Sequence, residues 1–256
     1  NIAEICHQKG MTAIVLSPGS RSAPLAISFW RHSEFECRVV PDERSAAYQA
    51  LGMASATGKP VGLVCTSGTA PLNYTPAIAE AYWQGIPLVA FTADRPPEWI
   101  GQGENQTIHQ QHIYAANSKA FFQLSPSLHP SRDEQHAYQQ VNTAINTACC
   151  VPVGPVQVNV PFREPLYPEK PLPRPEPDIL SHEKVYAEPR LSEASLTALS
   201  EAINSSTKIL VVAGMGTPSR KALQVLGEFI RQTQAVLIDD LLANAHSLPE
   251  AVTTVD

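Results

Sequence analysis

Short apolar runs alternate with longer amphipathic segments along the first 160 residues of the chain. The apolar runs, rich in Val, Ile and Leu, predict strands at residues 13–16, 37–40, 61–65, 87–91 and 156–160. The segments between them are richer in Ala, Gln and Leu, and they predict helices at residues 43–57, 75–83 and 132–149. Strands that are apolar on both faces need helices on both sides of their sheet. This order therefore predicts a doubly wound parallel α/β sheet.

The pattern changes after Phe162, where prolines recur in a charged stretch. They are Pro165, Pro168, Pro171, Pro173, Pro175 and Pro177. Such a stretch can hold neither a helix nor a central strand. We therefore expect a first domain at residues 1–166, a Pro-rich linker at 167–190 and part of a second α/β domain at 191–256.

The second domain has the same alternation on a smaller scale. Helices are expected at residues 192–204 and 219–233, and strands at 208–213 and 235–239. Two strands are few for an independent parallel sheet, so we expect this domain to be incomplete at its end. At the other end of the chain, residues 2–8 are typical of a helix that has already begun.

Composition and charge narrow the class of protein. The chain has 18 basic and 24 acidic residues, a formal net charge of -6 and no basic block that could follow a nucleic-acid backbone. No apolar stretch approaches the roughly 20 residues that a membrane-spanning helix needs, and the first residues do not resemble a signal peptide. We expect a cytoplasmic protein that binds neither nucleic acid nor membrane.

The cysteines predict no covalent framework. They are Cys6, Cys37, Cys65, Cys149 and Cys150. Most lie in apolar runs and no CxxC occurs, so we expect inert, reduced core thiols and neither a zinc site nor disulfides.

Four polar loops carry the candidate chemistry, because each directly follows a predicted strand. They cover residues 17–22, 41–44, 66–69 and 92–97. If the strands are parallel, all four loops meet at one edge of the sheet. This convergence predicts a binding site there.

The first two loops have both a functional and a structural interpretation. Arg21 offers a two-pronged donor for a carboxylate, and Ser20 and Ser22 can cap the next helix, but a capped turn with a solvated arginine fits equally well. Glu43 opens the helix at 43–57, with Asp42 at its N-cap position. An ordinary first-turn glutamate is the simpler interpretation of Glu43.

The other two loops are equally open. Residues 66–69 could bind a phosphate or a heterocycle through backbone N–H groups, but they lack the spacing and lysine of a P-loop. Arg95, between Asp94 and two prolines, is either held to meet an anion or paired with Asp94.

Two further features have weaker functional interpretations. Residues 102–106 form a polar loop that could close over the site, and His109 and His112 could share a helix face without a third metal ligand. Residues 214–216, with Asp239 or Asp240 after the next strand, resemble a dinucleotide fingerprint that lacks its third glycine. For this feature we favour a structural turn over NAD binding.

Together the loops resemble one thiamine diphosphate enzyme family, the 2-succinyl-5-enolpyruvyl-6-hydroxy-3-cyclohexene-1-carboxylate synthases of menaquinone biosynthesis. The matching strings are Ser17-Pro18-Gly19-Ser20-Arg21-Ser22, Asp42-Glu43-Arg44, Thr66-Ser67-Gly68-Thr69-Ala70, Thr92-Ala93-Asp94-Arg95-Pro96-Pro97-Glu98, Asn105-Gln106 and Pro161-Phe162-Arg163-Glu164-Pro165-Leu166. The resemblance implies a pyrimidine-binding domain followed by the start of a Rossmann-like central domain. The family's third domain, which binds diphosphate and Mg²⁺ or Mn²⁺, has no counterpart in this chain.

The resemblance also implies roles for particular residues. Glu43 would hydrogen-bond the cofactor's aminopyrimidine and help to activate it, which requires burial to raise its pKa. The implied reaction decarboxylates 2-oxoglutarate and adds the succinyl unit to isochorismate. The implied substrate-binding residues are Ser20, Arg21, Arg95, Asn105 and Gln106, and the implied further cofactor contacts are Pro18 and Thr69.

The family's site forms between subunits, so a homodimer or homotetramer is implied and this chain alone should be inactive. Two alternatives stay open. One is another thiamine diphosphate decarboligase, similar to acetolactate synthase. The other is a non-catalytic binding or dimerisation module.

Overall fold

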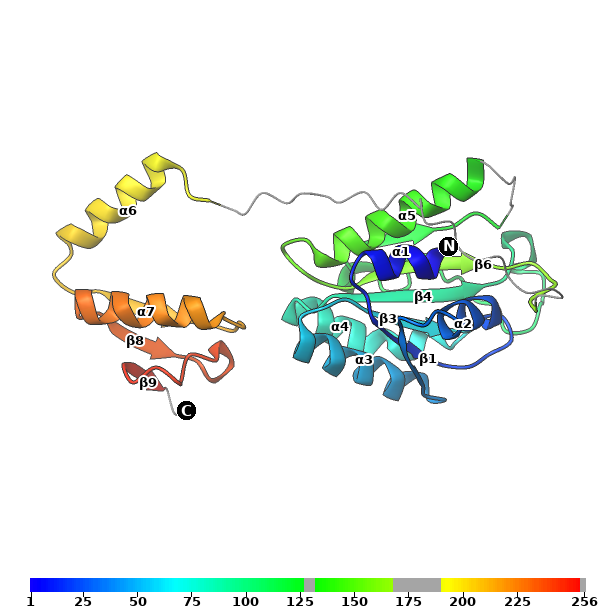
Figure 1. Cartoon of the computed structure of the whole chain (residues 1–256), viewed down its shortest axis with the longest axis horizontal. Coiled ribbons are helices and arrows are strands. Elements are labelled where there is room, and N and C mark those ends of the chain that lie inside the picture. Colours follow the sequence, from blue (N-terminus) through cyan, green and yellow to red (C-terminus); the bar gives the residue numbers. More distant parts are fainter. Residues whose placement is uncertain (127–131, 168–189, 254–256) are drawn as a thin grey trace. The chain divides into compact units, whose positions relative to one another are not determined.

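The computed structural model describes residues 1–126, 132–167 and 190–253, apart from the side chains of residues 132 and 253. It divides into two compact units, residues 1–186 and 187–256, which are considered separately (Figure 1). Nearly all of the predicted linker lies outside the described residues.

The first unit is built on one six-stranded sheet. Its strands are β1 (Ala13–Leu16), β2 (Glu36–Val39), β3 (Val61–Cys65), β4 (Leu88–Asp94), β5 (Ala120–Gln123) and β6 (Val156–Pro161). They lie in the order β2-β1-β3-β4-β6-β5, and every pair is parallel. The doubly wound sheet is therefore confirmed. The sequence analysis missed β5, whose four residues are only half-buried.

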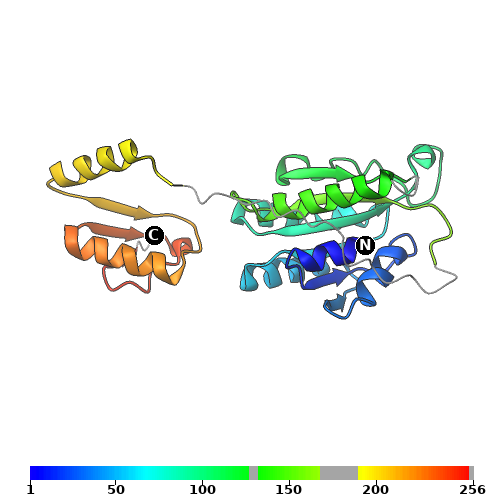
Figure 2. The ribbon, with the colours of Figure 1, turned by 45° about the horizontal axis from the view of Figure 1, so that its top comes forward.

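Helices cover both faces of this sheet (Figures 1 and 2). One face carries α1 (Ile2–Gln8), α2 (Ala23–Trp30) and α5 (Arg132–Cys149), and the other carries α3 (Glu43–Thr57) and α4 (Thr75–Gln84). Alternation along the strands divides the side chains between two cores, with Ile14 and Leu16 in the first and Val15 in the second. Burial on both faces explains why the strands are nearly continuously apolar.

The caps of α3 agree with the sequence, whereas that of α2 does not. Asp42 accepts a hydrogen bond from the backbone N–H of Ser45 at 2.7 Å, and Gly58 ends α3 with a φ of 66°. At α2, Ser22 occupies the N-cap position without capping the helix, because its hydroxyl donates back to the Gly19 carbonyl at 3.0 Å. The expectation that Ser22 caps α2 was wrong.

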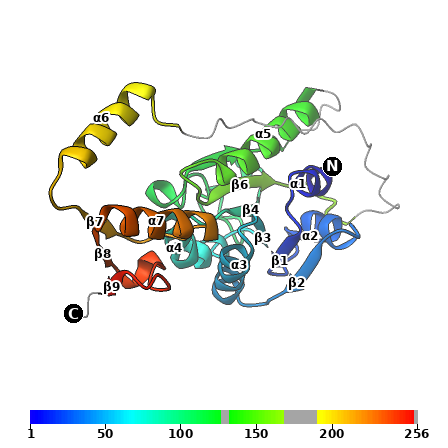
Figure 3. The same cartoon turned by 60° about the vertical axis from the view of Figure 1, so that its left-hand side comes forward.

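The second unit has a three-stranded parallel sheet in the order β7-β8-β9 (Leu210–Ala213, Val236–Asp239, Ala251–Thr253). Helix α7 (Arg220–Thr233) packs on one face through Ile230 (Figure 3). The opposite face leaves Leu210, Val212, Val236 and Val252 more than half exposed, and α6 (Glu193–Ser205) buries no residue. The described helices include none long and apolar enough to cross a membrane.

Candidate functional site

The four polar loops follow the carboxyl ends of β1, β2, β3 and β4. After β1 the chain moves to β2 on one side, whereas β3 lies on the other side of β1, so the order of the strands reverses there. Ligands bind doubly wound sheets at such a point. The loops after β1 and β3 touch, because a Cβ on Gly19 would collide with the side chain of Thr66.

Arg21 is a deeply buried charged side chain of the site, with 4% of its surface exposed. Its Nη1 donates to the Phe162 carbonyl at 2.9 Å, and its Nη2 lies 3.5 Å from a carboxylate oxygen of the exposed Glu164. Burial lowers the pKa of Arg21, and the nearby charge of Arg95 lowers it further. A solvated Arg21 is therefore excluded.

In the described part of the chain, no salt bridge joins the Arg95 guanidinium to the Asp94 carboxylate. The interpretation of Arg95 as an ion-pair partner of Asp94 is therefore excluded. Asp94 accepts from the backbone N–H of Arg95 at 2.8 Å and from the Asn159 amide at 2.7 Å, while burial raises its pKa. The Arg95 guanidinium instead donates to the Asn105 carbonyl at 3.1 Å. Within the described residues, the buried Nε–H groups of Arg21 and Arg95 have no acceptor. Each can still donate to an anion.

Trp99 joins the two arginines and was missed in the sequence. The guanidinium carbons of Arg21 and Arg95 lie 5.7 and 6.0 Å from the centre of its ring. The residue ends the short helix η2 (Pro97–Trp99), and its backbone N–H donates to the Pro96 carbonyl at 2.9 Å. The only sequence signal was an aromatic residue directly after the matched string.

Glu43 lies at the other side of the loop cluster and is half-buried as the first residue of α3. It is close to the end of β3, since its charge adds to burial in raising the pKa of the Cys65 thiol. The Tyr74 hydroxyl is buried beside Cys65 and Ser17, but without a well-formed hydrogen bond in the described part of the chain. A carboxylate and two buried hydroxyls thus meet near the ends of β1 and β3.

The loop at residues 102–106 packs on the loop after β3. The Gln106 amide donates to the Ser67 carbonyl at 3.0 Å, and the Ser67 hydroxyl donates to the Gln106 carbonyl at 3.1 Å. Gly68 has a φ of 85°, and a Cβ there would lie 2.8 Å from the Gln106 side chain. Gln106 itself adopts the left-handed region, with a φ of 58°. The side chain of Gln106 thus holds a loop, a role the sequence did not reveal.

A network of buried polar side chains forms hydrogen bonds with these loops. The sequence did not predict this network. The side-chain carbonyl of Gln110 accepts from the Gly68 backbone N–H at 2.9 Å. The side-chain amide of Gln110 donates to the Ala93 backbone carbonyl at 3.0 Å and to the Asn159 side-chain carbonyl at 2.9 Å. Asn159 also accepts from Thr92 at 2.8 Å. Polar residues inside an apolar strand were the available signal, because buried polar groups need partners.

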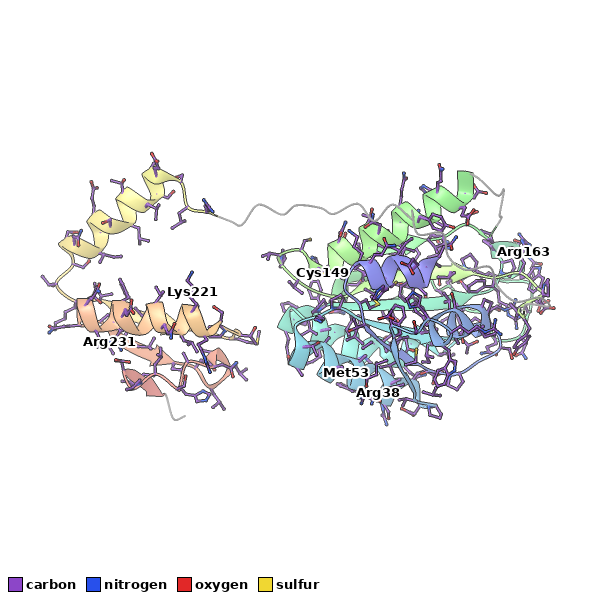
Figure 4. All side chains as sticks on the ribbon, viewed as in Figure 1. Arg38, Met53, Cys149, Arg163, Lys221 and Arg231 are labelled. Carbon is purple, nitrogen blue, oxygen red and sulfur yellow. The ribbon has the colours of Figure 1, made fainter. Side chains whose placement is uncertain are left out.

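The remaining predicted site residues lie at the same edge but are less constrained. Pro18, Ser20 and Thr69 are exposed on the loops after β1 and β3, and Asn105 is exposed beside Arg95. Arg163, which is labelled in Figure 4, also lies at this end of the unit, where it forms an ion pair with Glu98.

The histidines do not share a helix face, so that expectation was wrong. His109 and His112 lie in irregular backbone and turns, and the His112 ring stacks on Phe121 with centroids 4.2 Å apart. Across the described ranges, no group of three His, Cys, Asp or Glu residues could hold a metal ion.

The cysteines differ in burial. None of the five described cysteines forms a disulfide; Cys6 and Cys65 are buried, whereas Cys149 is exposed, so not every cysteine is a core thiol. Cys149 lies at the opposite end of the first unit from Arg163 (Figure 4), away from the loop cluster.

In the second unit, Gly214 and Gly216 line a hollow of about 500 Å³ beside the start of α7. Hydrogen bonds close this turn, since Gly216 donates to the Leu242 carbonyl at 3.0 Å and accepts from the Asn244 amide at 2.8 Å. These bonds agree with the structural turn that the sequence favoured.

Comparisons with known proteins give a consistent result. The family model described as "Thiamine pyrophosphate enzyme, N-terminal TPP binding domain" matches residues 1–113. A 2-succinyl-5-enolpyruvyl-6-hydroxy-3-cyclohexene-1-carboxylate synthase from Cytophaga hutchinsonii is 43% identical, covering 100% of this chain and 45% of that protein. The synthase of the same name from Porphyromonas gingivalis is 40% identical, covering 95% of this chain and 42% of that protein. The chain thus spans less than half the length of these relatives.

Solved structures share the fold at low sequence identity. Benzoylformate decarboxylase from Polynucleobacter necessarius superposes with a TM-score of 0.75 at 19% identity, covering 99% of this chain and 46% of that one. A thiamine diphosphate-dependent 4-hydroxybenzoylformate decarboxylase from Rhodococcus jostii gives 0.73, also at 19% identity, covering 93% and 43%.

Proposed function

This chain belongs to the 2-succinyl-5-enolpyruvyl-6-hydroxy-3-cyclohexene-1-carboxylate synthase family, and from this premise we propose its function. The full-length protein decarboxylates 2-oxoglutarate and adds the succinyl unit to isochorismate, with thiamine diphosphate as cofactor. One observation carries the proposal: Arg21 and Arg95 are close together, each with a buried Nε–H that lacks an acceptor among the described residues. Both proposed substrates are dianions, which such a pair suits.

Glu43 is the proposed catalytic residue on the cofactor side. Thiamine diphosphate, when bound, supplies a nucleophilic carbon that adds to a 2-oxo acid and accepts the electrons released with carbon dioxide. The residues fit its aminopyrimidine half, since Glu43 is half-buried after a strand end and close to Cys65 at the end of β3. The Glu43 carboxyl would share a proton with a ring nitrogen of the cofactor, and contact with the ring would complete its burial.

The other loop residues have positioning roles in the proposal. Ser20, Asn105 and Gln106 line the substrate side, and Pro18 and Thr69 the cofactor side. The hydrogen bonds of Gln106 to Ser67 and of Asn105 to Arg95 support this placement, because they join the two sides of the site.

The proposal extends to domains and partners. Residues 1–166 act as the pyrimidine-binding domain, 167–190 as a linker and 191–256 as part of a central domain. The diphosphate and its Mg²⁺ or Mn²⁺ are held by residues outside this chain, in another subunit of a homodimer or homotetramer. Free cysteines support a cytoplasmic location.

Turnover by the full-length protein tests this function. Purified enzyme with thiamine diphosphate and Mg²⁺ should release carbon dioxide from 2-oxoglutarate and, with isochorismate present, form the joined product detected by mass spectrometry. Pyruvate should react at least about a hundredfold more slowly. A preference for pyruvate would instead identify a decarboligase similar to acetolactate synthase, and no reaction with either acid would favour a binding module.

A further inference from the structure

Trp99 is in contact with both candidate substrate-binding arginines, although it lies outside the motifs that identified them. Its ring centre is 5.7 Å from the guanidinium carbon of Arg21 and 6.0 Å from that of Arg95. Both distances are within the range of a cation–π interaction. A single half-buried indole thus serves two cations that come from the loops after β1 and β4.

The arginine pair needs a partner such as Trp99 to stabilise its two positive charges. The two positive charges are close enough for Arg95 to lower the pKa of Arg21, which shows that they repel each other. The nearest carboxylate to Arg21, on Glu164, is exposed and 3.5 Å away, too far for a strong ion pair. In the described part of the chain, the guanidinium of Arg95 forms no salt bridge.

An aromatic ring and a carboxylate differ in which N–H donors of a bound guanidinium they leave free. A guanidinium attracted to a ring face keeps its in-plane N–H donors available, whereas a bidentate carboxylate would occupy them. This agrees with the two buried Nε–H groups that lack acceptors among the residues described. The contact therefore keeps both cations close together and ready to bind an anion.

The indole itself is held by its backbone. Trp99 is the last residue of η2, its N–H donates to the Pro96 carbonyl at 2.9 Å, and its carbonyl accepts from the Gln102 N–H at 3.3 Å. Its neighbour Glu98 forms an ion pair with Arg163. The backbone that carries the indole is thus held on both sides.

We propose that Trp99 is a positioning residue that sets the spacing of the Arg21 and Arg95 guanidiniums and so favours substrates with two carboxylates over those with one. This inference rests on the proposed function, because it assumes that the arginine pair binds the substrate. It adds a residue that selects for the second charge.

Binding of unreactive acids to the full-length protein tests the proposal without relying on turnover. Glutarate carries two carboxylates and butyrate one, and calorimetry gives the Kd of each. Trp99→Leu should weaken glutarate binding about tenfold, as loss of two cation–π contacts implies, and butyrate binding less than twofold. Trp99→Phe, which keeps a ring, should recover most of the glutarate affinity.

Turnover and a matched control complete the test. Trp99→Leu should raise KM for 2-oxoglutarate about tenfold with a smaller change in kcat. Trp83→Leu removes a tryptophan that is 71% exposed on α4 and is the control for general effects. Circular dichroism melts show whether each variant folds, and the Phe variant keeps the test valid if the Leu variant does not.

The outcomes separate the two proposals. Unchanged glutarate affinity in Trp99→Leu, an equal loss for butyrate, or no recovery in Trp99→Phe would each overturn the role of Trp99. If Arg21→Ala and Arg95→Ala also bind glutarate normally, the proposed substrate-binding role of the arginines fails as well. Loss in the arginine variants alone would leave the proposed function intact and refute only the role of Trp99.

Discussion

The four loops after β1, β2, β3 and β4 have an arginine side, with Arg21 and Arg95, and a glutamate side, with Glu43. The two sides differ in how much of their burial and hydrogen bonding the chain itself supplies. On the arginine side, Arg21 is 4% exposed and the loop after β4 is held by hydrogen bonds that extend to Asn159. On the glutamate side, Glu43 is half-buried at the start of α3, with its carboxylate still in contact with solvent. The chain itself therefore holds Arg21 and Arg95, the proposed substrate donors, in place, whereas Glu43, the proposed cofactor activator, would need a partner to bury it.

This difference is physically reasonable. Arginine keeps its charge when it is buried, so a folded domain can hold it ready for an anion. A carboxyl group that must keep a proton needs burial, and burial by the cofactor itself supplies it only when catalysis is possible.

The largest expected effect comes from replacing Glu43, on the glutamate side. Glu43→Gln in the full-length protein should slow hydrogen–deuterium exchange at C2 of bound thiamine diphosphate at least about a hundredfold, since an amide cannot shuttle the proton. Cofactor affinity should change little. NMR of the quenched cofactor measures the exchange, and Glu36→Gln, an exposed change on β2, is the matched control. Normal exchange in Glu43→Gln would remove Glu43 from the mechanism.

The next largest effect comes from replacing Arg21, on the arginine side. Arg21→Ala should raise KM for 2-oxoglutarate by about 10- to 100-fold, because a charge-assisted hydrogen bond to a carboxylate is lost. Exchange at C2 should stay normal in this variant, measured before substrate is added. Arg38→Ala, at a half-exposed arginine on β2, serves as control. Parallel loss of exchange and substrate binding would mean that the two sides are not separate.

A third change tests the support beneath the arginine side. Asn159→Ala removes one buried hydrogen-bond partner from Asp94 and one from Gln110, and it should lower the free energy of unfolding by about 3 kcal/mol in urea titrations. Asn159 opposes the burial that raises the pKa of Asp94. The deficit should therefore be larger near neutral pH, where Asp94 is ionised, than in acid, where Asp94 is protonated.

The control for that change is Asn204→Ala, at an exposed asparagine on α6 with one long bond to Ser200. We expect it to lie within about 0.5 kcal/mol of the parent chain. Equal stability of the Asn159 and Asn204 variants would show that the network does not hold the site.

The smallest effect concerns the loop after β3, on the glutamate side. Tyr114→Phe removes a buried hydroxyl that donates to the Pro71 carbonyl at 2.8 Å, and it should destabilise the chain by about 1 kcal/mol. Tyr167→Phe, on a side chain that is 60% exposed, should have no measurable effect in the same urea titration. A loss well above 2 kcal/mol would show that this loop is as tightly supported as the arginine side.

Strand periodicity was enough to predict most of the fold. The apolar runs located five of the six strands in the first sheet, and Asp42 and Gly58 marked both ends of α3. Strand β9 has only three residues, and the four residues of β5 include no Val, Ile or Leu, so neither gives a clear pattern. The error at Ser22 arose because a serine before a helix can bond to a preceding carbonyl as well as cap.

The site was predicted less completely, for a physical reason. Charged residues after strand ends are visible in a sequence, so Arg21, Glu43 and Arg95 could be named as candidates, and the family resemblance then implied their roles. Trp99 and Gln110 act through contacts with residues from other loops, and such contacts depend on tertiary packing. Side chains that position others are therefore harder to predict than those that meet a ligand.

The strand order also has a consequence for synthesis on the ribosome. Strand β6 is the last of its sheet in the sequence, yet it lies between β4 and β5 and carries Asn159. A nascent chain that ends before residue 156 cannot pair β4 with β6 or form the hydrogen bond from Asn159 to Asp94. The arginine side of the site is therefore assembled last during translation, when the final strand leaves the exit tunnel.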